Sequence, residues 1–335
     1  MKIRVGINGM GRIGRMIVRA IIESKNTNIE IKHINNLTDS ETCSTLIKYD
    51  SIHGKFNADI GFDKNYLFIN KNKISFSQEA EIENINWKKY NVDYVLECTG
   101  KFNSKEKLIP HLKNGAKKVI VSAPCKNADK TIVFGVNESM LNKKDQIISA
   151  ASCTTNCLAA VASILNDHFK IEKGFMTTIH AFTSDQRILD NSHKDPRRGR
   201  AANLSIVPTS TGASKAIGEI IPALKGKLEG IAMRVPTANV SIVELVFCTR
   251  KNLTIKKIND TFRNFIKKKS TNIIEITDEK LVSIDFNHNP ASAIIDASLT
   301  NVVGKNMGKI SAWYDNEWGF SNRMCDILKY VHKIS

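Results

Sequence analysis

The glycine pattern near the start of the chain constrains the fold more than any other feature. Residues 2–8, KIRVGIN, have the apolar character of a buried strand, and Gly9, Gly11 and Gly14 follow directly as G-x-G-x-x-G. The next stretch carries apolar residues at helical spacing, and residues 29–35 form a second strand-like run. Strand, glycine turn, helix and strand predict a βαβ unit, in which the pyrophosphate of a dinucleotide can approach the helix N-terminus.

Further strand-like runs extend this unit through the first 150 residues. They lie at 92–98, 118–122, 131–136 and 147–150, with a helical stretch at 104–114. This alternation predicts an α/β fold with a Rossmann-type, doubly wound parallel sheet.

The pattern of predicted strands and helices changes after residue 152. Longer strand-like runs occur at 174–183, 231–249, 292–303 and 308–315, with a helix at 254–268, and they indicate an α+β domain with a mixed or antiparallel sheet. We therefore expect an NAD(P)-binding Rossmann domain over 1–152, completed by a C-terminal helix at 319–335. A catalytic domain over 153–318 would contain the long polar loop at 184–204.

Charge and composition exclude some classes of protein. The chain of 335 residues has a formal net charge of +16, but its lysines are dispersed and lack the pattern of a recognition helix. A basic nucleic-acid-binding protein with a vestigial active site stays an alternative, with nucleic acid not expected as the main partner. We find no membrane span and no signal peptide, so we expect a cytoplasmic protein without a membrane partner. The seven cysteines lack the spacing of a disulfide framework or a zinc site, so we expect reduced thiols and no metal.

A cysteine at the junction of a strand and a helix is the first candidate for chemistry. Cys153 follows the run at 147–150 and precedes an apolar-periodic helix, where backbone N–H groups and the helix dipole favour a thiolate. His180, inside the strand-like TTIHAFT, could hold that thiolate and exchange a proton with it. A nicotinamide cofactor beside a nucleophilic cysteine suggests aldehyde oxidation through a thiohemiacetal and an enzyme thioester. The nucleophile that resolves the thioester, water or another group, is open at this point.

The choice of cofactor is also open. The dinucleotide fingerprint calls for an acidic residue about 20 positions after the glycines, to hold the ribose 2′-hydroxyl. The sequence there, HINNLTDS, offers Asn36 instead. A carboxamide can bond to a hydroxyl, yet it does not repel a 2′-phosphate.

Seven motifs carry a resemblance along essentially the whole chain. They are INGMGRIGR, SAPC, SAASCTTNC, HAFTSDQ, RRGRAANLSIVPTSTGASKA, LKGKLEGIAMRVPTANVS and WYDNEWGFSNR. In this order, from residue 3 to about 331, the chain resembles the phosphorylating glyceraldehyde-3-phosphate dehydrogenases of bacterial type. The resemblance implies conversion of D-glyceraldehyde 3-phosphate and inorganic phosphate to 1,3-bisphosphoglycerate, with hydride transfer to NAD(P), in glycolysis, gluconeogenesis or both. It also implies a homotetramer in which loop 184–204 lies near a neighbouring subunit's cofactor.

The resemblance further implies roles for single residues. Cys153 would be the nucleophile and His180 the base. The residues implied around the C3 phosphate of the substrate are Thr183, Asp185 and Arg234. The residues implied around the attacking phosphate are Ser152, Thr154, Thr211 and Gly212, with Arg198 as a helper. The residues implied around the cofactor are Gly9, Gly11, Arg12, Ile13, Gly14, Asn36, Thr99, Gly100, Ser122 and Asn316, the last at the nicotinamide carboxamide.

Three departures from the family pattern concern the cofactor. Asn36 replaces the aspartate usual in NAD-specific members, and Ala80 stands where a basic residue is common. Asn191 and Ser192 stand where NAD-specific bacterial members often carry Leu-Pro. We predict a relaxed choice, in which NAD is used and NADP is tolerated.

Two related enzymes are rival interpretations. The family of erythrose-4-phosphate dehydrogenases shares the cysteine, the histidine and text like VSIDFNHNPASAIID, but lacks the S-T-G motif that this chain retains at 210–212. Because losing a phosphate subsite favours hydrolysis over phosphorolysis, we favour glyceraldehyde 3-phosphate as the substrate. A reductase of acyl phosphates such as aspartyl phosphate agrees less well with the full set of motifs.

Overall fold

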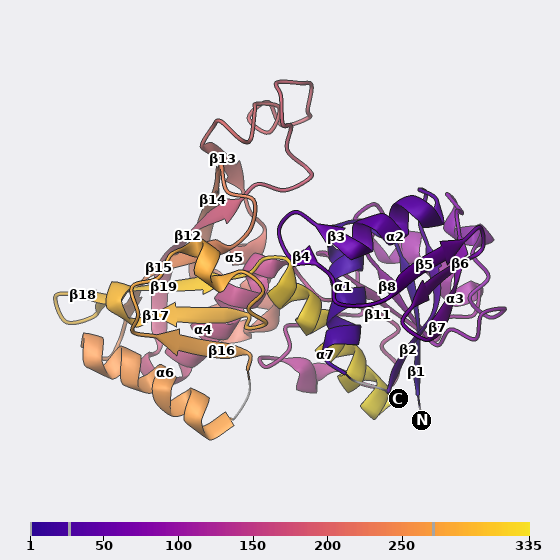
Figure 1. Ribbon diagram of the computed structural model, residues 1–335. Helices are drawn as coiled ribbons and strands as arrows, with labels where there is room; N and C mark the ends of the chain where they lie inside the picture. Colours follow the sequence, from indigo (N-terminus) through magenta and orange to yellow (C-terminus); the bar gives the residue numbers. More distant parts are fainter. Residues whose placement is uncertain (1, 26–27, 270–271) are drawn as a thin grey trace. The chain divides into compact units, whose positions relative to one another are not determined.

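The computed structural model describes residues 2–25, 28–269 and 272–335 (Figure 1). The chain divides into two compact units. The first runs up to Ser152 and includes Ser321–Ser335, and the second is Cys153–Phe320. None of the helices in these ranges has the length and apolar character that a bilayer crossing requires.

The first unit is built on a nine-stranded sheet in the order β10-β11-β9-β8-β1-β2-β7-β6-β5. Six of its strands are β1 (Ile3–Asn8), β2 (Ile29–Asn35), β8 (Tyr94–Glu97), β9 (Lys118–Val121), β10 (Lys130–Thr131) and β11 (Ile147–Ser149). These six pair in parallel, and β7 (Asn72–Ser77) joins β2 in parallel as well. Strands β5 (Ile60–Asp63) and β6 (Tyr66–Ile69) form an antiparallel edge. The predicted Rossmann-type sheet is confirmed.

The strand order places a crevice at the ends of the central strands. Strand β1 lies between β2 and β8, so the direction of winding reverses at β1. Ligands of doubly wound sheets bind at the carboxyl ends of the strands where this reversal occurs.

The helices of the first unit are α1 (Arg12–Glu23), α2 (Ser40–Lys48), α3 (Lys105–Lys113) and most of α7 (Trp318–Ile334). A small sheet pairs β3 (Tyr49–Asp50) with β4 (Gly54–Lys55).

The second unit contains an eight-stranded mixed sheet. Seven strands follow the order β13-β14-β12-β15-β19-β17-β16, and β18 (Asn301–Val303) pairs with β19. The seven are β12 (Ile171–Ala181), β13 (Val207–Ser210), β14 (Leu228–Val235), β15 (Ser241–Thr249), β16 (Ile274–Thr277), β17 (Ala293–Asp296) and β19 (Met307–Tyr314). Pairs β12–β14 and β16–β17 are parallel and the others antiparallel, as the prediction of a mixed sheet requires.

Helices cover one face of this second sheet. Helix α4 (Cys153–Phe169) contacts β12, β15, β17 and β19, α5 (Ala213–Ile220) contacts β14, and α6 (Ile255–Lys269) contacts α4 and β16. Along β15 buried residues alternate with half-buried ones, because successive side chains of a strand point to opposite faces. The opposite face therefore keeps half-exposed side chains.

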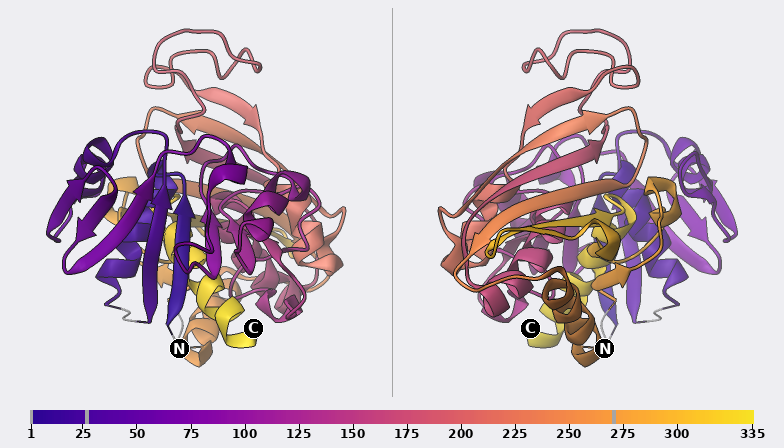
Figure 2. Two further views of the ribbon diagram at one scale, coloured as in Figure 1. Left: turned by 90° about the vertical axis from the view of Figure 1, so that its right-hand side faces the viewer. Right: turned by 90° about the vertical axis from the view of Figure 1, so that its left-hand side faces the viewer.

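Three predicted strands are shorter than expected. The run 231–249 divides into β14 and β15, because Pro236 interrupts the ladder and Val240 adopts a φ of 65°. The run 292–303 divides into β17, a 3-10 helix at Ala297–Leu299, and β18, while the run 131–136 keeps only its first residue in β10. The predicted loop 184–204 lies between β12 and β13 and projects from that edge of the sheet in Figures 1 and 2.

Candidate functional site

Cys153 is the first residue of helix α4. The chain leaves β11 through Ala151, whose φ of 59° lies in the left-handed region and turns the backbone into the helix. At this position the backbone N–H groups of Cys153 and Thr154 are within hydrogen-bonding reach of the thiol. The turn at Ala151 thus fixes where the thiol stands.

The structure brings Cys153 and His180 together. His180 lies near the end of β12 and is 3% exposed, and its Nε2 is 3.5 Å from Sγ of Cys153. Strands β12 and β14 pair in parallel with His180 opposite Arg234, so the two side chains meet. Nη1 of Arg234 is 2.6 Å from Nδ1 of His180 and donates to the carbonyl of Ala181 at 3.1 Å.

The protonation of this pair follows from burial. Burial raises the pKa of the Cys153 thiol, and the charge of Arg234 with the hydrogen bonds at Thr154 offsets only part of that rise. Burial, with the charge of Arg234, lowers the pKa of His180 to about 3. The backbone hydrogen bonds at the helix start do lower the pKa of the thiol, as expected, but desolvation outweighs them and the net shift is upward. Thiol and imidazole are neutral together at pH 7.

The position of the imidazole proton decides which nitrogen can act as a base. Nδ1 lies 2.6 Å from the carbonyl oxygen of Ala181, to which an Nδ1–H donates. In that tautomer Nε2 has a free lone pair facing the thiol. If Nδ1 instead accepts a hydrogen bond from Nη1 of Arg234, the ring hydrogen is on Nε2 and the base is blocked.

The residues implied around the two phosphates lie on several elements of the second unit, apart from Ser152, which ends the first segment of the first unit. Thr183 and Asp185 follow β12, and Asp185 forms an ion pair with Arg198 of the loop. Thr211 Oγ1 accepts the N–H of Ala213 at 3.2 Å, in the turn where Gly212 caps α5. Ser152 directly precedes Cys153. Hydroxyls, arginines and a helix start are groups that bind phosphate.

Asp185 is a poor direct ligand for a phosphate because both are anions. Its carboxylate faces Arg198, and Nε2 of His193 lies 3.5 Å away. The place of Asp185 next to Arg198 fits a carboxylate that orients the guanidinium of Arg198.

The sequence analysis missed Tyr314. Its side chain is 1% exposed, and its hydroxyl is 2.9 Å from Oγ1 of both Thr154 and Thr178. Its ring meets that of His180 edge-on, with centroids 6.0 Å apart. The residue lies inside WYDNEW, a motif quoted for Asn316, and a buried tyrosine that needs a partner for its hydroxyl was the signal available there.

The glycine turn of the first unit fits a dinucleotide. A Cβ on Gly14 would lie 2.1 Å from the carbonyl oxygen of Gly9, and Gly9 itself has a φ of 93°. A Cβ on Gly11 would meet no atom within 4 Å. Gly9 and Gly14 make the tight packing possible, and Gly11 leaves open space for a ligand at the start of α1.

A hollow of about 180 Å³ lies at the carboxyl ends of β1, β2 and β8. Its lining includes Gly9, Gly11, Asn36, Ala80, Thr99, Lys101 and Phe102. Four of the residues implied at the cofactor are thus gathered at the predicted edge. The remaining ones in this unit are Arg12, Ile13 and Gly14 in the first turn of α1, Gly100 next to Thr99, and Ser122 directly after β9.

Several of these side chains already have partners. Oδ1 of Asn36 accepts the N–H of Met10 at 3.0 Å, and its Nδ2 donates to Thr38. The guanidinium of Arg12 pairs with Asp50. Thr99 donates through its N–H to Glu97 at 2.8 Å. Asn36 therefore supports the glycine turn through its bond to Met10. It also leaves the cofactor hollow without the carboxylate that the dinucleotide fingerprint calls for at this position.

Asn316, implied at the nicotinamide, belongs to the second unit. It follows β19 and is 6% exposed, and its Oδ1 accepts a hydrogen bond from Oγ of Ser241 at 3.0 Å. The carboxamide is thus fixed by strand β15.

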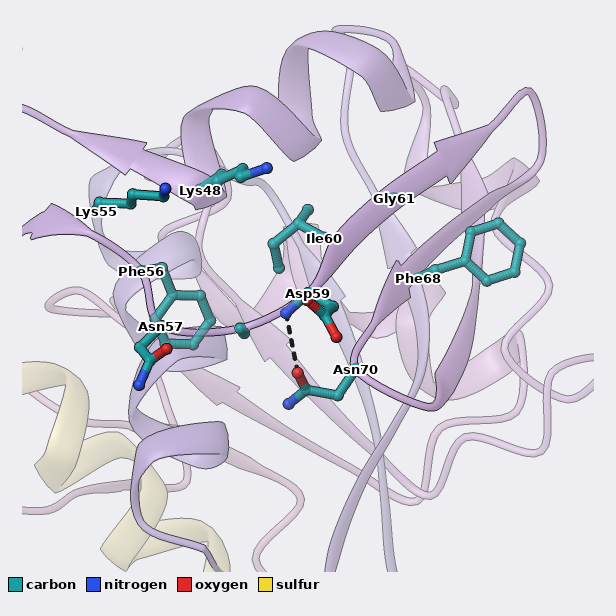
Figure 3. Close-up of a pocket in the computed structure, with 10 residues that line it drawn as sticks. Lys48, Lys55, Phe56, Asn57, Asp59, Ile60, Gly61, Phe68 and Asn70 are labelled. Atoms are coloured by element: carbon teal, nitrogen blue, oxygen red, sulfur yellow. Dashed lines mark hydrogen bonds between the residues drawn. The ribbon is translucent and has the colours of Figure 1, made fainter.

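A second hollow of the first unit contains none of the implied site residues. Figure 3 shows it between α2, β5 and β6, with Lys48, Lys55, Phe56 and Phe68 in its wall. Its volume is about 630 Å³. A hydrogen bond of 3.0 Å joins the N–H of Asp59 to Oδ1 of Asn70 across it. Although this hollow is larger, the glycine turn and the strand ends favour the smaller one as the cofactor site.

Comparisons with known proteins match both units. The family described as glyceraldehyde 3-phosphate dehydrogenase, NAD binding domain, matches residues 3–105, and the C-terminal domain of the same description matches residues 152–316. The chain is 46% identical over 333 residues to glyceraldehyde-3-phosphate dehydrogenase 2 of Bacillus subtilis, covering 99% of this chain and 97% of that protein. It is 48% identical over 332 residues to glyceraldehyde-3-phosphate dehydrogenase of Geobacillus stearothermophilus, covering 99% and 98%. Identity to the enzyme of that name from Cereibacter sphaeroides is 48% over 326 residues, covering 97% of each chain.

Proposed function

The chain belongs to the glyceraldehyde-3-phosphate dehydrogenase family, and from that premise we propose that Cys153 is its nucleophile and His180 its general base. The enzyme oxidises and phosphorylates D-glyceraldehyde 3-phosphate with NAD. The observation that carries the proposed roles is the 3.5 Å approach of Nε2 to a half-buried thiol at a helix start. We assign cofactor binding to residues 1–152 with the helix at 319–335, and catalysis to residues 153–318.

The reaction begins with transfer of a proton from Sγ to Nε2 as the sulfur attacks the aldehyde carbon. The carbon–sulfur bond gives a thiohemiacetal on Cys153, and the Nδ1–H bond to Ala181 stabilises the charged imidazole. NAD, when bound, supplies the hydride acceptor that makes this adduct a thioester. Inorganic phosphate then attacks the thioester carbon and releases its proton to solvent, the carbon–sulfur bond breaks, and the thiolate takes back a proton from His180.

Two anion subsites serve this sequence. Arg234 and Thr183 bind the C3 phosphate of the substrate, and Asp185 keeps Arg198 in place beside them. The hydroxyls of Ser152, Thr154 and Thr211, with the backbone at Gly212, hold the attacking phosphate. When Arg234 turns toward the substrate's phosphate, it releases Nδ1 of His180 for the tautomer in which Nε2 is the base.

Phosphate dependence tests this function. With D-glyceraldehyde 3-phosphate and NAD, we expect sustained formation of reduced nicotinamide only when inorganic phosphate is present. The measurement is steady-state absorbance with and without phosphate. A sustained rate without phosphate, or better turnover of erythrose 4-phosphate, would assign the chain to hydrolytic chemistry instead.

The cofactor preference depends on Asn36. Because position 36 carries no charge, we predict that NADP is accepted and that NAD is preferred by less than about a hundredfold in kcat/KM. Asn36→Asp should raise the NAD preference at least tenfold, since a carboxylate there repels a 2′-phosphate at about 1 to 4 kcal/mol for close charges near a surface. Asn36→Ala is the neutral control, and it should lower both efficiencies without changing their ratio. A wild-type preference for NAD well above a hundredfold would refute the prediction.

The loop between β12 and β13 supports assembly into a homotetramer. Ile188, Leu189, Leu204 and Ile206 are 56%, 75%, 78% and 69% exposed, on a segment that projects from the sheet in Figure 1. Several large apolar side chains exposed on one segment favour contact with another subunit. Light scattering should give a mass near four chains, and a monomer mass would contradict the assembly.

A further inference from the structure

Ser241 lies between the strand that carries His180 and the turn that carries Asn316. Its side chain is buried, and its Oγ accepts the backbone N–H of Ala181 at 3.1 Å and donates to Oδ1 of Asn316 at 3.0 Å. Because a backbone N–H can only donate, the hydroxyl is the acceptor in the first bond, and its proton serves the second. The three groups form a hydrogen-bond chain with one direction.

The backbone beside Ser241 is held in an unusual conformation. Val240 has a φ of 65°, which is rare for a β-branched residue, and it is 3% exposed. On its other side Nδ2 of Asn239 donates to Asp315 at 2.9 Å. The residues that flank Val240 therefore bond to the consecutive residues Asp315 and Asn316. Such a conformation persists only where its surroundings fix it, and it clusters at functional sites.

We propose that Ser241 is a positioning residue that aligns the carboxamide of Asn316 with the backbone of the base His180, a role that rests on the proposed function. Since Ser241 occupies Oδ1, the NH₂ group is the end of Asn316 that can donate to the carboxamide oxygen of a nicotinamide. The same hydroxyl fixes Ala181, whose carbonyl accepts the proton of Nδ1. The side chain of Ser241 thus positions two groups at once: the carboxamide of Asn316, which would face the nicotinamide, and the carbonyl of Ala181, which orients the base His180.

Two readouts that need no turnover test this role in Ser241→Ala. We expect NAD affinity, measured by fluorescence titration, to fall about tenfold, the usual size of one lost buried hydrogen bond. We expect alkylation of Cys153 by iodoacetamide in cofactor-free enzyme, followed by mass spectrometry, to slow at least threefold. In an Asn316→Ala background, Ser241→Ala should change NAD affinity by less than about twofold, because the effect passes through Asn316.

Thr249 provides the matched control. It is fully buried at the other end of β15, and its Oγ1 donates to the carbonyl of Lys251 at 2.8 Å. Thr249→Val should lower the melting temperature as Ser241→Ala does and leave both readouts unchanged. If Ser241→Ala does not fold, Ser241→Cys, which keeps a weak donor of similar shape, carries the test.

An unchanged NAD affinity, an unchanged alkylation rate, or an equal loss of affinity in the Asn316→Ala background would overturn the role of Ser241. Failure of the wild-type chain to oxidise D-glyceraldehyde 3-phosphate would overturn the proposed function instead. The two failures are distinguishable, because binding and alkylation are measured without turnover.

Discussion

Cys153→Ser should lower kcat/KM for D-glyceraldehyde 3-phosphate by about ten-thousandfold or more, because the loss of an activated nucleophile removes the whole covalent route. A serine hydroxyl has a far higher pKa than a thiol, and His180 is too weak a base to deprotonate it. The measurement is steady-state kinetics with saturating NAD and phosphate. The fold should be intact, since the smaller oxygen fits in the place of the sulfur.

Cys157 is the control for this substitution. It lies one helical turn further along α4, is fully buried, and its Sγ faces the carbonyl of Ala312 at 3.9 Å. Cys157→Ala should cost about 1 kcal/mol in stability and keep kcat/KM within about threefold. Substantial activity in Cys153→Ser, or a comparable loss in Cys157→Ala, would show that Cys153 is not the nucleophile.

His180→Asn should lower kcat/KM by about a hundredfold to ten-thousandfold, the usual contribution of a positioned general base. The asparagine can hold a similar place in β12 but cannot accept the proton of the thiol. Burial keeps the pKa of the Cys153 thiol high, so at pH 7 alkylation of Cys153 should also slow at least tenfold. As the pH rises toward the thiol's own pKa, hydroxide replaces the base and the difference from wild type should shrink.

His168→Asn is the matched histidine control. His168 lies in the last turn of α4, at the opposite end from Cys153, with its Nδ1 2.9 Å from the carbonyl of Ile164. We expect wild-type kinetics and a wild-type alkylation profile. An alkylation rate in His180→Asn that equals wild type at pH 7 would exclude His180 as the base.

The sequence predicted the fold where patterns are local. The glycine turn, the alternating strands of the first unit and the start of α4 each follow from a periodicity or a special residue within a short window. The missed segments, among them α2 and β5 to β7, are short or polar and carry weaker periodicity. The break in the run 231–249 depends on the conformation of Val240, which contacts from distant residues impose.

The sequence predicted which residues form the candidate site better than it predicted their charge environment and protonation. Motif spacing placed Cys153 and His180 in one site, but not Arg234 against the imidazole, which depends on the register of β12 with β14. The raised pKa of the thiol follows from burial, which only the packed structure defines. Tyr314 and Ser241 act through bonds to residues far along the chain, and their own sequence neighbourhood gives no sign of these partners.

The covalent intermediate on Cys153 is the central claim, and mass spectrometry of the intact enzyme tests it most directly. The enzyme is mixed with D-glyceraldehyde 3-phosphate and NAD without phosphate, quenched in acid, and digested to locate the modified residue. We predict an acyl group on the peptide that contains Cys153, and its loss within one turnover after phosphate is added. An unmodified Cys153 peptide, or an adduct that phosphate does not remove, would contradict the account.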